Sequence, residues 1–373
     1  MVTVDIGNVT SSMYFLPDIP DIEVSTAADK VLIQVVLSDG DATSETPINQ
    51  YYFTSENGMV LYDVADLAKT FMDRHGLVFC NCSVTATVQD SDVIWDDQED
   101  EVTFKIFYAS MVTGQSVDNI NDFFLVSSDK KILYKTSPLG ESVGFLNVEA
   151  ENIPNNIKTL KTFAACLLND GTTKLVTIEE NIDLTGIAVY ANSLTFSYNS
   201  LLLAAKAVNQ NVKEILSFRM ELGNRVVSYV VCSEDTELVN FFSFKNEFGF
   251  PETIALPGAI KEINSYTQAV AVSGHSRIKY DATVEQSFQL QSAALPTFME
   301  ETVTSLLLAK TVTAWIFRSM KPVIVTDSTW EKANEIGTVN AVKFTYKLTD
   351  DRPVRYSGSV TKIFNNVYDN TYG

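Results

Sequence analysis

The chain has 373 residues, which is enough for two or three domains of the usual size. Its hydrophobic content of 46% suits packed cores and excludes an intrinsically disordered chain. Its formal net charge of −20 disfavours binding to nucleic-acid phosphates and to anionic membrane surfaces, and no apolar run approaches the roughly 18 residues of a membrane-spanning helix.

Residues 1–20 are predicted to form an extended N-terminal arm. Pro17 and Pro20 lie near its end, where proline suits the lead-in to a strand. The same pattern is compatible with a terminus that is simply frayed.

Residues 21–116 are predicted to form a first β module with one short helix. A strand is predicted at 31–37, ended by the turn residues 38–41. A second strand is predicted at 77–88, where apolar and polar residues alternate from 83 to 88. Between them, a helix is predicted to begin after Asp63 as its N-cap and to end at Gly76. Its buried face would contain residues spaced by three or four positions, namely Val64, Leu67, Phe71 and Met72.

Residues 117–232 are predicted to form a second β module with the same order of strands, short helix and long strand. Its helix follows Tyr198, and either Asn199 or Ser200 could be the N-cap. Strands at 215–222 and 225–232 form a hairpin around a Gly-Asn turn. The shared order favours a tandem duplication, although generic β-sandwich patterning would also produce it.

Residues 233–373 are predicted to form a C-terminal β-rich domain with one amphipathic helix. Pro296 is placed at the first position of that helix, which is expected to reach about Lys310. Its buried stripe would consist of Met299, Val303, Leu306 and Leu307. The whole chain is therefore expected to be mainly β, or β-rich α+β, with two β-sandwich-like modules followed by this domain.

The residues that most often carry catalysis are scarce. His75 and His275 are the two histidines, and the sequence around His275 lacks the second glycine of a nucleophile elbow. The four cysteines match no zinc spacing and are expected to be reduced core residues. We therefore expect neither an enzyme nor a bound cofactor.

An acidic stretch lies around Trp95. Clustered carboxylates are the ligands that calcium prefers, so a calcium site is conceivable, although the spacing does not fit an EF-hand. An exposed loop between two strands explains the same composition. The weak calcium candidates are Asp92, Asp96, Asp97 and Glu99.

A short aromatic segment is the clearest candidate for an interaction surface. Asn246 is predicted to hydrogen-bond to nearby backbone, and Gly249 to adopt a positive φ before Pro251 fixes the exit. This could be a turn in the core of one domain or a contact between subunits. The interaction candidates are Phe244, Asn246, Phe248, Phe250 and Trp95.

Residues 240–253 resemble a segment of tail-associated structural proteins of tailed phages and prophages of Bacteroides-type bacteria. The pieces at 296–310, 313–317 and 321–327, together with Asn57-Gly58 and Asp63, are also similar to parts of those proteins. The resemblance implies a structural subunit of a virion and carries over no catalytic residues.

The sequence and the resemblance together predict a structural subunit of a bacteriophage particle, in the tail, the connector or an attached spike. It would act by assembling with copies of itself and with other virion proteins, without nucleic acid or membrane insertion. It would be located in the virion and assembled in the cytoplasm of the bacterial host. The alternative is an adhesin-like module that binds glycans of the host surface.

Overall fold

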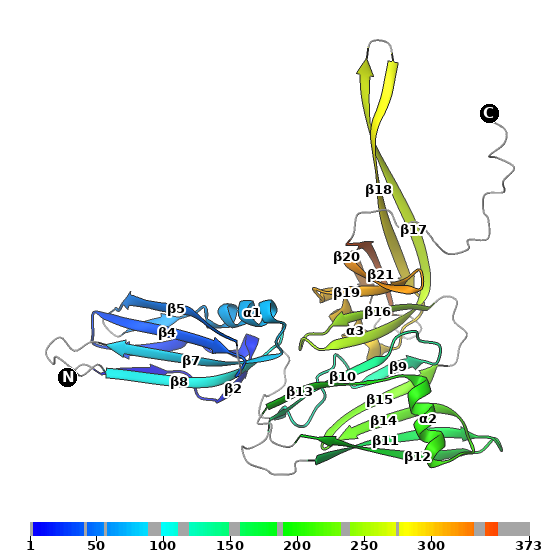
Figure 1. Ribbon diagram of the computed structural model, residues 1–373, viewed down its shortest axis with the longest axis horizontal. Helices are drawn as coiled ribbons and strands as arrows, with labels where there is room; N and C mark the ends of the chain where they lie inside the picture. Colours follow the sequence, from blue (N-terminus) through cyan, green and yellow to red (C-terminus); the bar gives the residue numbers. More distant parts are fainter. Residues whose placement is uncertain are drawn as a thin grey trace. The chain divides into compact units, whose positions relative to one another are not determined.

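The computed structural model confirms the predicted mainly β fold, with 63% of the residues in strands and a C-terminal six-stranded barrel (Figure 1). The structure describes residues 3–40, 43–55, 58–88, 98–110, 119–148, 157–184, 189–232, 239–273, 276–331 and 340–349. The chain divides into two compact units. Unit 1 contains residues 1–135, 140–232 and 245–252, and unit 2 contains residues 136–139, 233–244 and 253–373.

The first module of unit 1 has a five-stranded sheet of order β2-β8-β7-β4-β5 and a three-stranded sheet of order β1-β3-β6. The strands are β1 (Val4–Gly7), β2 (Met13–Phe15), β3 (Ile22–Thr26), β4 (Lys30–Ser38), β5 (Ser44–Phe53), β6 (Met59–Leu61), β7 (Phe79–Val88) and β8 (Gln98–Phe107). A 3-10 turn, η1 (Leu16–Asp18), follows β2. The described residues before position 20 thus contribute two strands to these sheets.

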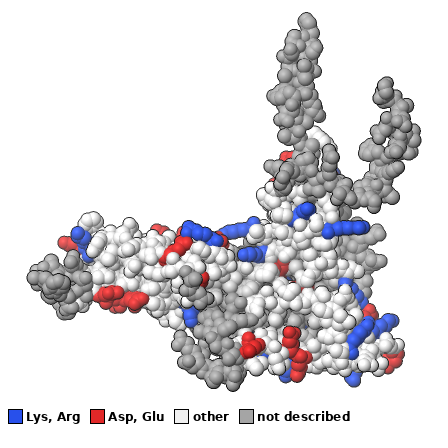
Figure 2. Space-filling model, in the orientation of Figure 1, with Lys and Arg blue, Asp and Glu red and all other residues white. Residues whose placement is uncertain are grey.

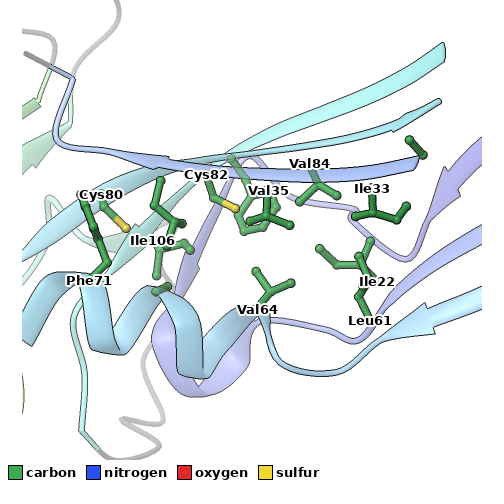
Figure 3. Close-up of a cluster of buried hydrophobic side chains, with 14 of the residues drawn as sticks. Ile22, Ile33, Val35, Leu61, Val64, Phe71, Cys80, Cys82, Val84 and Ile106 are labelled. Carbon is green, nitrogen blue, oxygen red and sulfur yellow. The ribbon is translucent and has the colours of Figure 1, made fainter. Parts of the chain in front are cut away.

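Helix α1 (Val64–His75) packs on the core of the first module (Figure 3). Val64, Phe71 and Met72 are buried as predicted, whereas Leu67 is half-buried. Gly76 ends the helix with φ +67°. Asp63 occupies the N-cap position, but its side chain makes no capping hydrogen bond. Cys80 and Cys82 face the same core, where burial raises the pKa of the Cys80 thiol to about 12 and keeps it protonated.

The second module of unit 1 has a five-stranded sheet of order β12-β11-β14-β15-β9 and a two-stranded sheet of order β10-β13. Its elements are β9 (Lys130–Tyr134), β10 (Glu141–Val148), β11 (Ile157–Leu168), β12 (Thr173–Asp183), β13 (Val189–Phe196), α2 (Tyr198–Val208), β14 (Val212–Leu222) and β15 (Arg225–Cys232). The N-cap of α2 is Ser197, which forms a capping box with Ser200. The prediction of Asn199 or Ser200 as the cap is therefore wrong.

The large sheets of the two modules share one topology, although their small sheets differ in strand number. In each, the large sheet begins with a short edge strand that pairs in parallel with the last strand, β2 with β8 and β9 with β15. In each, the remaining pairs of that sheet are antiparallel, and one helix precedes the next-to-last strand. The common order that the sequence indicated is therefore a common pairing scheme.

A third apolar cluster in unit 1 combines side chains from both modules and from the turn at 246–250. Phe15 contacts Phe107 and Phe248, with ring centroids 6.4 and 5.9 Å apart. The buried members are Phe15, Phe107, Ala109, Ile120, Leu125, Leu146, Phe248 and Phe250. The segment 245–252 is thus anchored by apolar burial in unit 1.

Unit 2 contains a closed barrel of order β16-β17-β18-β21-β20-β19. The strands are β16 (Val239–Lys245), β17 (Pro251–Ser273), β18 (Ser276–Ser292), β19 (Val312–Ile316), β20 (Ser319–Glu331) and β21 (Ala341–Leu348). Phe242, Phe288, Phe344 and Tyr346 form its aromatic core; the rings of Phe288 and Tyr346 stack with centroids 5.3 Å apart.

The predicted C-terminal helix is shorter than expected. A 3-10 turn, η3 (Thr297–Met299), precedes helix α3 (Glu300–Leu308), and Pro296 lies just before both elements instead of at the first helical position. Met299, Val303 and Leu306 are buried, whereas Leu307 is half-buried. Among the described residues, no helix has the length and apolar character that crossing a membrane would require.

Candidate functional site

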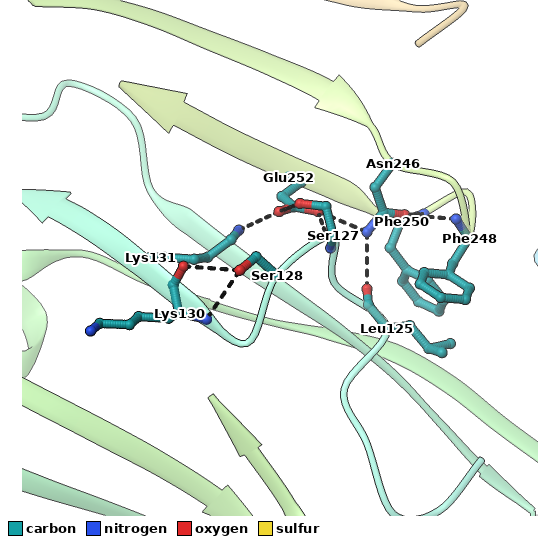
Figure 4. Close-up of polar contacts among 9 residues, drawn as sticks. All are labelled: Leu125, Ser127, Ser128, Lys130, Lys131, Asn246, Phe248, Phe250 and Glu252. Atoms are coloured by element: carbon teal, nitrogen blue, oxygen red, sulfur yellow. Dashed lines mark hydrogen bonds and ion pairs between the residues drawn. The ribbon is translucent and has the colours of Figure 1, made fainter. Parts of the chain in front are cut away.

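Asn246 builds the turn between β16 and β17 (Figure 4). Its side-chain oxygen accepts hydrogen bonds from the backbone N–H groups of Phe248 and Phe250, both at 3.1 Å. Gly249 adopts φ +79°, a conformation that suits a residue without a Cβ atom. The predicted hydrogen bond from Asn246 to nearby backbone and the predicted positive φ of Gly249 are both confirmed.

Glu252 is a carboxylate with no exposed surface, and it lies beside the turn (Figure 4). The ammonium group of Lys131, itself buried, lies 2.6 Å from the Glu252 carboxylate. The Ser127 N–H donates to this carboxylate at 3.1 Å and the Asn246 side-chain amide at 2.9 Å, and the Ser127 hydroxyl donates as well. These contacts join β9, β17 and the loop before β9 through one carboxylate.

The electrostatics of Glu252 favour the charged form. Burial alone raises its pKa, but the charge of Lys131 and the hydrogen bonds from Lys131, Ser127 and Asn246 outweigh burial, so the pKa of Glu252 is lowered. Nearby, burial, followed by the charges of Glu141 and Glu252, raises the pKa of Tyr229. The arrangement stabilises a fixed ion pair inside unit 1 and presents no acid or base to solvent.

The interaction candidates of the turn make their contacts inside the chain. Phe248 and Phe250 belong to the third apolar cluster of unit 1, and Asn246 is buried with them. Phe244 is buried in unit 2, where β16 pairs with β19. Trp95 lies outside the described residues.

Most of the acidic stretch also lies outside the described residues, including Asp92, Asp96 and Asp97. Glu99 is described; it stands on β8 opposite Thr87 of β7. Within the described ranges, no group of three or more His, Cys, Asp or Glu side chains is placed to hold a metal ion. The calcium hypothesis therefore gains no ligand set from the described residues.

An open pocket of about 520 Å³ lies on the first module's large sheet, and Val148 of β10 in the second module also lines it. Its lining includes hydroxyl, amide and ammonium groups that can hydrogen-bond to a polar ligand. Phe104 also lines it, but this ring is buried and offers little face for stacking on a sugar. The polar lining residues are Ser12, Ser38, Asn81, Ser83, Thr103 and Lys105.

The outer face of the second module's large sheet is different, because a mostly apolar row, interrupted by Ser217, crosses it. Residues paired across neighbouring strands share a face of the sheet, and the pairing places five residues in one row. We call this row the outer stripe; it consists of Leu175, Ala165, Ser217, Val230 and Ile132, on β12, β11, β14, β15 and β9. Leu175 is 61% exposed and Val230 is 43% exposed.

The first module also has an apolar row on the outer face of its large sheet, but that row is packed in the third apolar cluster; it consists of Phe15, Phe107 and Phe79, paired across β2, β8 and β7. Other rows of that face are polar, as in Gln34, Thr85 and Glu101, which are paired across β4, β7 and β8. The alternating pattern of β14 and β15 was recognised in the sequence, but the outer stripe itself was missed. It appears only when the register of four strand pairs is known, since no spacing along the chain joins Leu175 to Ile132.

Edge strand β5 carries two further exposed aromatic side chains. Phe53 is 85% exposed and Tyr51 is 62% exposed. In the face that Figure 2 shows, many of the described residues are neither acidic nor basic. Large apolar side chains on an open sheet edge are typical of surfaces that meet another protein.

Comparison of the sequence with models of known protein families found no match, and a comparison with curated proteins also found none.

Proposed function

We propose that this protein is a structural subunit of a bacteriophage particle, in the tail, the connector or an attached spike, and that it acts by oligomeric assembly. The observation that carries assembly is the outer stripe, a mostly apolar row across all five strands of one sheet, in which Leu175 and Val230 are exposed and the other three residues are half-buried. Burying such a row is favourable at roughly 25 cal/mol per Å² of apolar surface. The placement in a phage particle comes from the sequence resemblance.

Two further features support assembly. Each large sheet of unit 1 ends in an edge strand, β5 or β12, and β12 contains no proline, so its outer backbone groups are available for pairing with another strand. Exposed apolar side chains accompany both edges, as Phe53 and Leu175 show. The proposed partners are copies of this chain and other virion proteins.

The assembly proposal predicts self-association that depends on the outer stripe. In sedimentation velocity of the full chain, Val230→Lys should shift oligomers toward monomers, because it replaces an exposed apolar side chain of the row with a charged one. Leu203→Lys is the matched control, since Leu203 is an exposed apolar residue on α2 and lies outside the row. Equal behaviour of the two variants would argue against the outer stripe.

The phage assignment is tested separately. Particles purified from a bacterium that encodes this chain should contain it in many copies by quantitative mass spectrometry. Its absence from purified particles would contradict a virion subunit even if the chain associates in solution.

Glycan binding is the second candidate, and the polar pocket on the first module supports it. If it binds a sugar, titration with host-surface polysaccharide should give a saturable signal that Asn81→Ala and Lys105→Ala reduce, because both residues line the pocket. Saturable binding by a chain that stays monomeric would favour this function over assembly.

A further inference from the structure

The hairpin of β17 and β18 continues far beyond the barrel (Figure 1). The two strands pair from Gly258 and Ser292 to the end at Ser273 and Ser276. On its other side β18 pairs with β21 only from Ser287 to Gln291, and β16 has seven residues against the 23 of β17. We call residues 264–286 the β arm.

The β arm is a two-stranded ribbon. At about 3.3 Å per residue, the ten residues of β17 in the arm span about 33 Å. Across the described residues, the pairing assigns its strands no third neighbour beyond Ser287. A ribbon of two strands is marginally stable in water, because each strand leaves one row of backbone N–H and C=O groups unpaired.

The edge of β17 in the β arm lacks most of the features that prevent an edge strand from pairing with a strand of another chain. Residues 264–273 include no charged residue, no proline and no glycine. Proteins usually protect an edge with charges or proline, as β5 does with Glu45 and Pro47. One irregularity in the pairing occurs between Ala269 and Val270, and the pairing from Asn264 to Ala269 is regular.

Charge indicates which partner fits this edge. The β arm has two basic residues, Arg277 and Lys279, and two acidic residues, Asp281 and Glu285, so its formal net charge is zero in a chain of −20. Two copies of the chain repel each other over most of their surface, but not at a neutral segment. A basic partner would instead be attracted to the acidic remainder of the chain.

We propose that the β17 edge of the β arm pairs antiparallel with the same edge of a second copy, forming a four-stranded sheet across a two-fold axis. This proposal rests on the proposed function of assembly and names the strand and the partner. Backbone hydrogen bonds supply the attraction, and they need no charge complementarity. Tyr266, which is 67% exposed near the base of the arm, would be one of the side chains covered.

The test compares two variants of the β arm, one with two lysines introduced on β17 and one with two lysines introduced on β18. Thr267→Lys with Gln268→Lys puts like charges on the β17 edge of both copies, where they would meet across the proposed junction. Thr283→Lys with Ala282→Lys is the matched control, because these residues lie directly opposite on β18 and add the same charge at the same height of the arm.

Sedimentation velocity of the full chain over a concentration series is the measurement. We expect the β17 variant to weaken dimerisation by more than about tenfold and the β18 variant to change it less than about threefold. Hydrogen exchange should show the amides of residues 264–273 that point away from β18 protected in the dimer and open to exchange after dilution.

Each other outcome has a distinct meaning. Association that neither variant weakens, or that both weaken equally, would overturn the pairing of the arms while leaving assembly through the outer stripe intact. A wild-type chain that remains monomeric at every concentration would overturn both the arm pairing and self-assembly. Urea unfolding of each variant shows whether the barrel still folds.

Discussion

At the residue scale, the buried pair of Lys131 and Glu252 is the arrangement most sensitive to substitution. Glu252→Ala should lower the free energy of unfolding by about 3–5 kcal/mol, because it leaves the ammonium of Lys131 buried without its partner. Urea unfolding of the full chain measures this loss. Glu179→Ala, in the exposed pair with Lys161, is the control and should cause little change.

The same carboxylate predicts a pH dependence of stability. Because the pKa of Glu252 is lowered in the folded chain, its contribution is present above the ordinary carboxyl pKa of 4.5 and is lost as the pH falls through the lower folded value. The stability difference between the wild type and Glu252→Gln should therefore shrink in acid. Unfolding free energies measured at about pH 7 and about pH 3 test this; a difference that grows in acid would show the opposite linkage.

Gly144 is required by the close approach of Phe250. A Cβ atom at Gly144 would lie 2.3 Å from the ring carbon Cγ of Phe250, so Gly144→Ala should destabilise the chain by about 1–3 kcal/mol. Gly140→Ala is the control, since its nearest neighbour would be a methyl group of Thr195 at 3.3 Å. Phe250→Leu should reduce the penalty of Gly144→Ala in a double-mutant cycle of unfolding free energies; strict additivity would mean that the two residues do not clash.

At the scale of the elements, the two module helices differ in how they begin. Ser197 caps α2 through its side chain, so Ser197→Ala should cost about 1 kcal/mol in unfolding free energy. Asp63 makes no such bond at the start of α1, so Asp63→Ala should cost less. Thermal unfolding followed by circular dichroism compares the two variants; a larger loss for Asp63→Ala would contradict the observed caps.

Local patterns predicted the elements whose causes are local. The alternation along β7, the apolar stripe of α1 and the turn chemistry of Asn246 and Gly249 all depend on near neighbours, and the structure contains each of them. The cap at Ser197 also has a local cause. However, Asn199 and Ser200 are residue types that favour the N-cap as well, so the sequence alone does not decide at which of the three the helix begins.

Long-range pairing was not predictable in the same way. Ser127 and Glu252 are 125 residues apart, so no spacing rule links the residues around this carboxylate. The outer stripe depends on the register of four strand pairs, and a shift of one residue would turn a whole strand to its other face. The length of the β arm depends on the pairing of β17 with β18, which local patterns do not specify.

At the scale of the whole molecule, one β module occurs twice, but the two copies have different outer surfaces. The first module presents polar rows and a pocket, whereas the second presents the outer stripe. Shared topology preserves the two cores, and the outward-facing residues remain free to change without disturbing them. This division agrees with the proposed role, in which one surface of a repeated module serves contact between subunits.

The mass of the assembly formed by the purified full chain tests self-association most directly. Native mass spectrometry over a concentration series should show discrete oligomers whose fraction increases with concentration. Stable oligomers of this kind need interfaces that bury more than roughly 1,000 Å². A single monomeric mass at the highest concentration, in a chain that unfolds cooperatively, would contradict it.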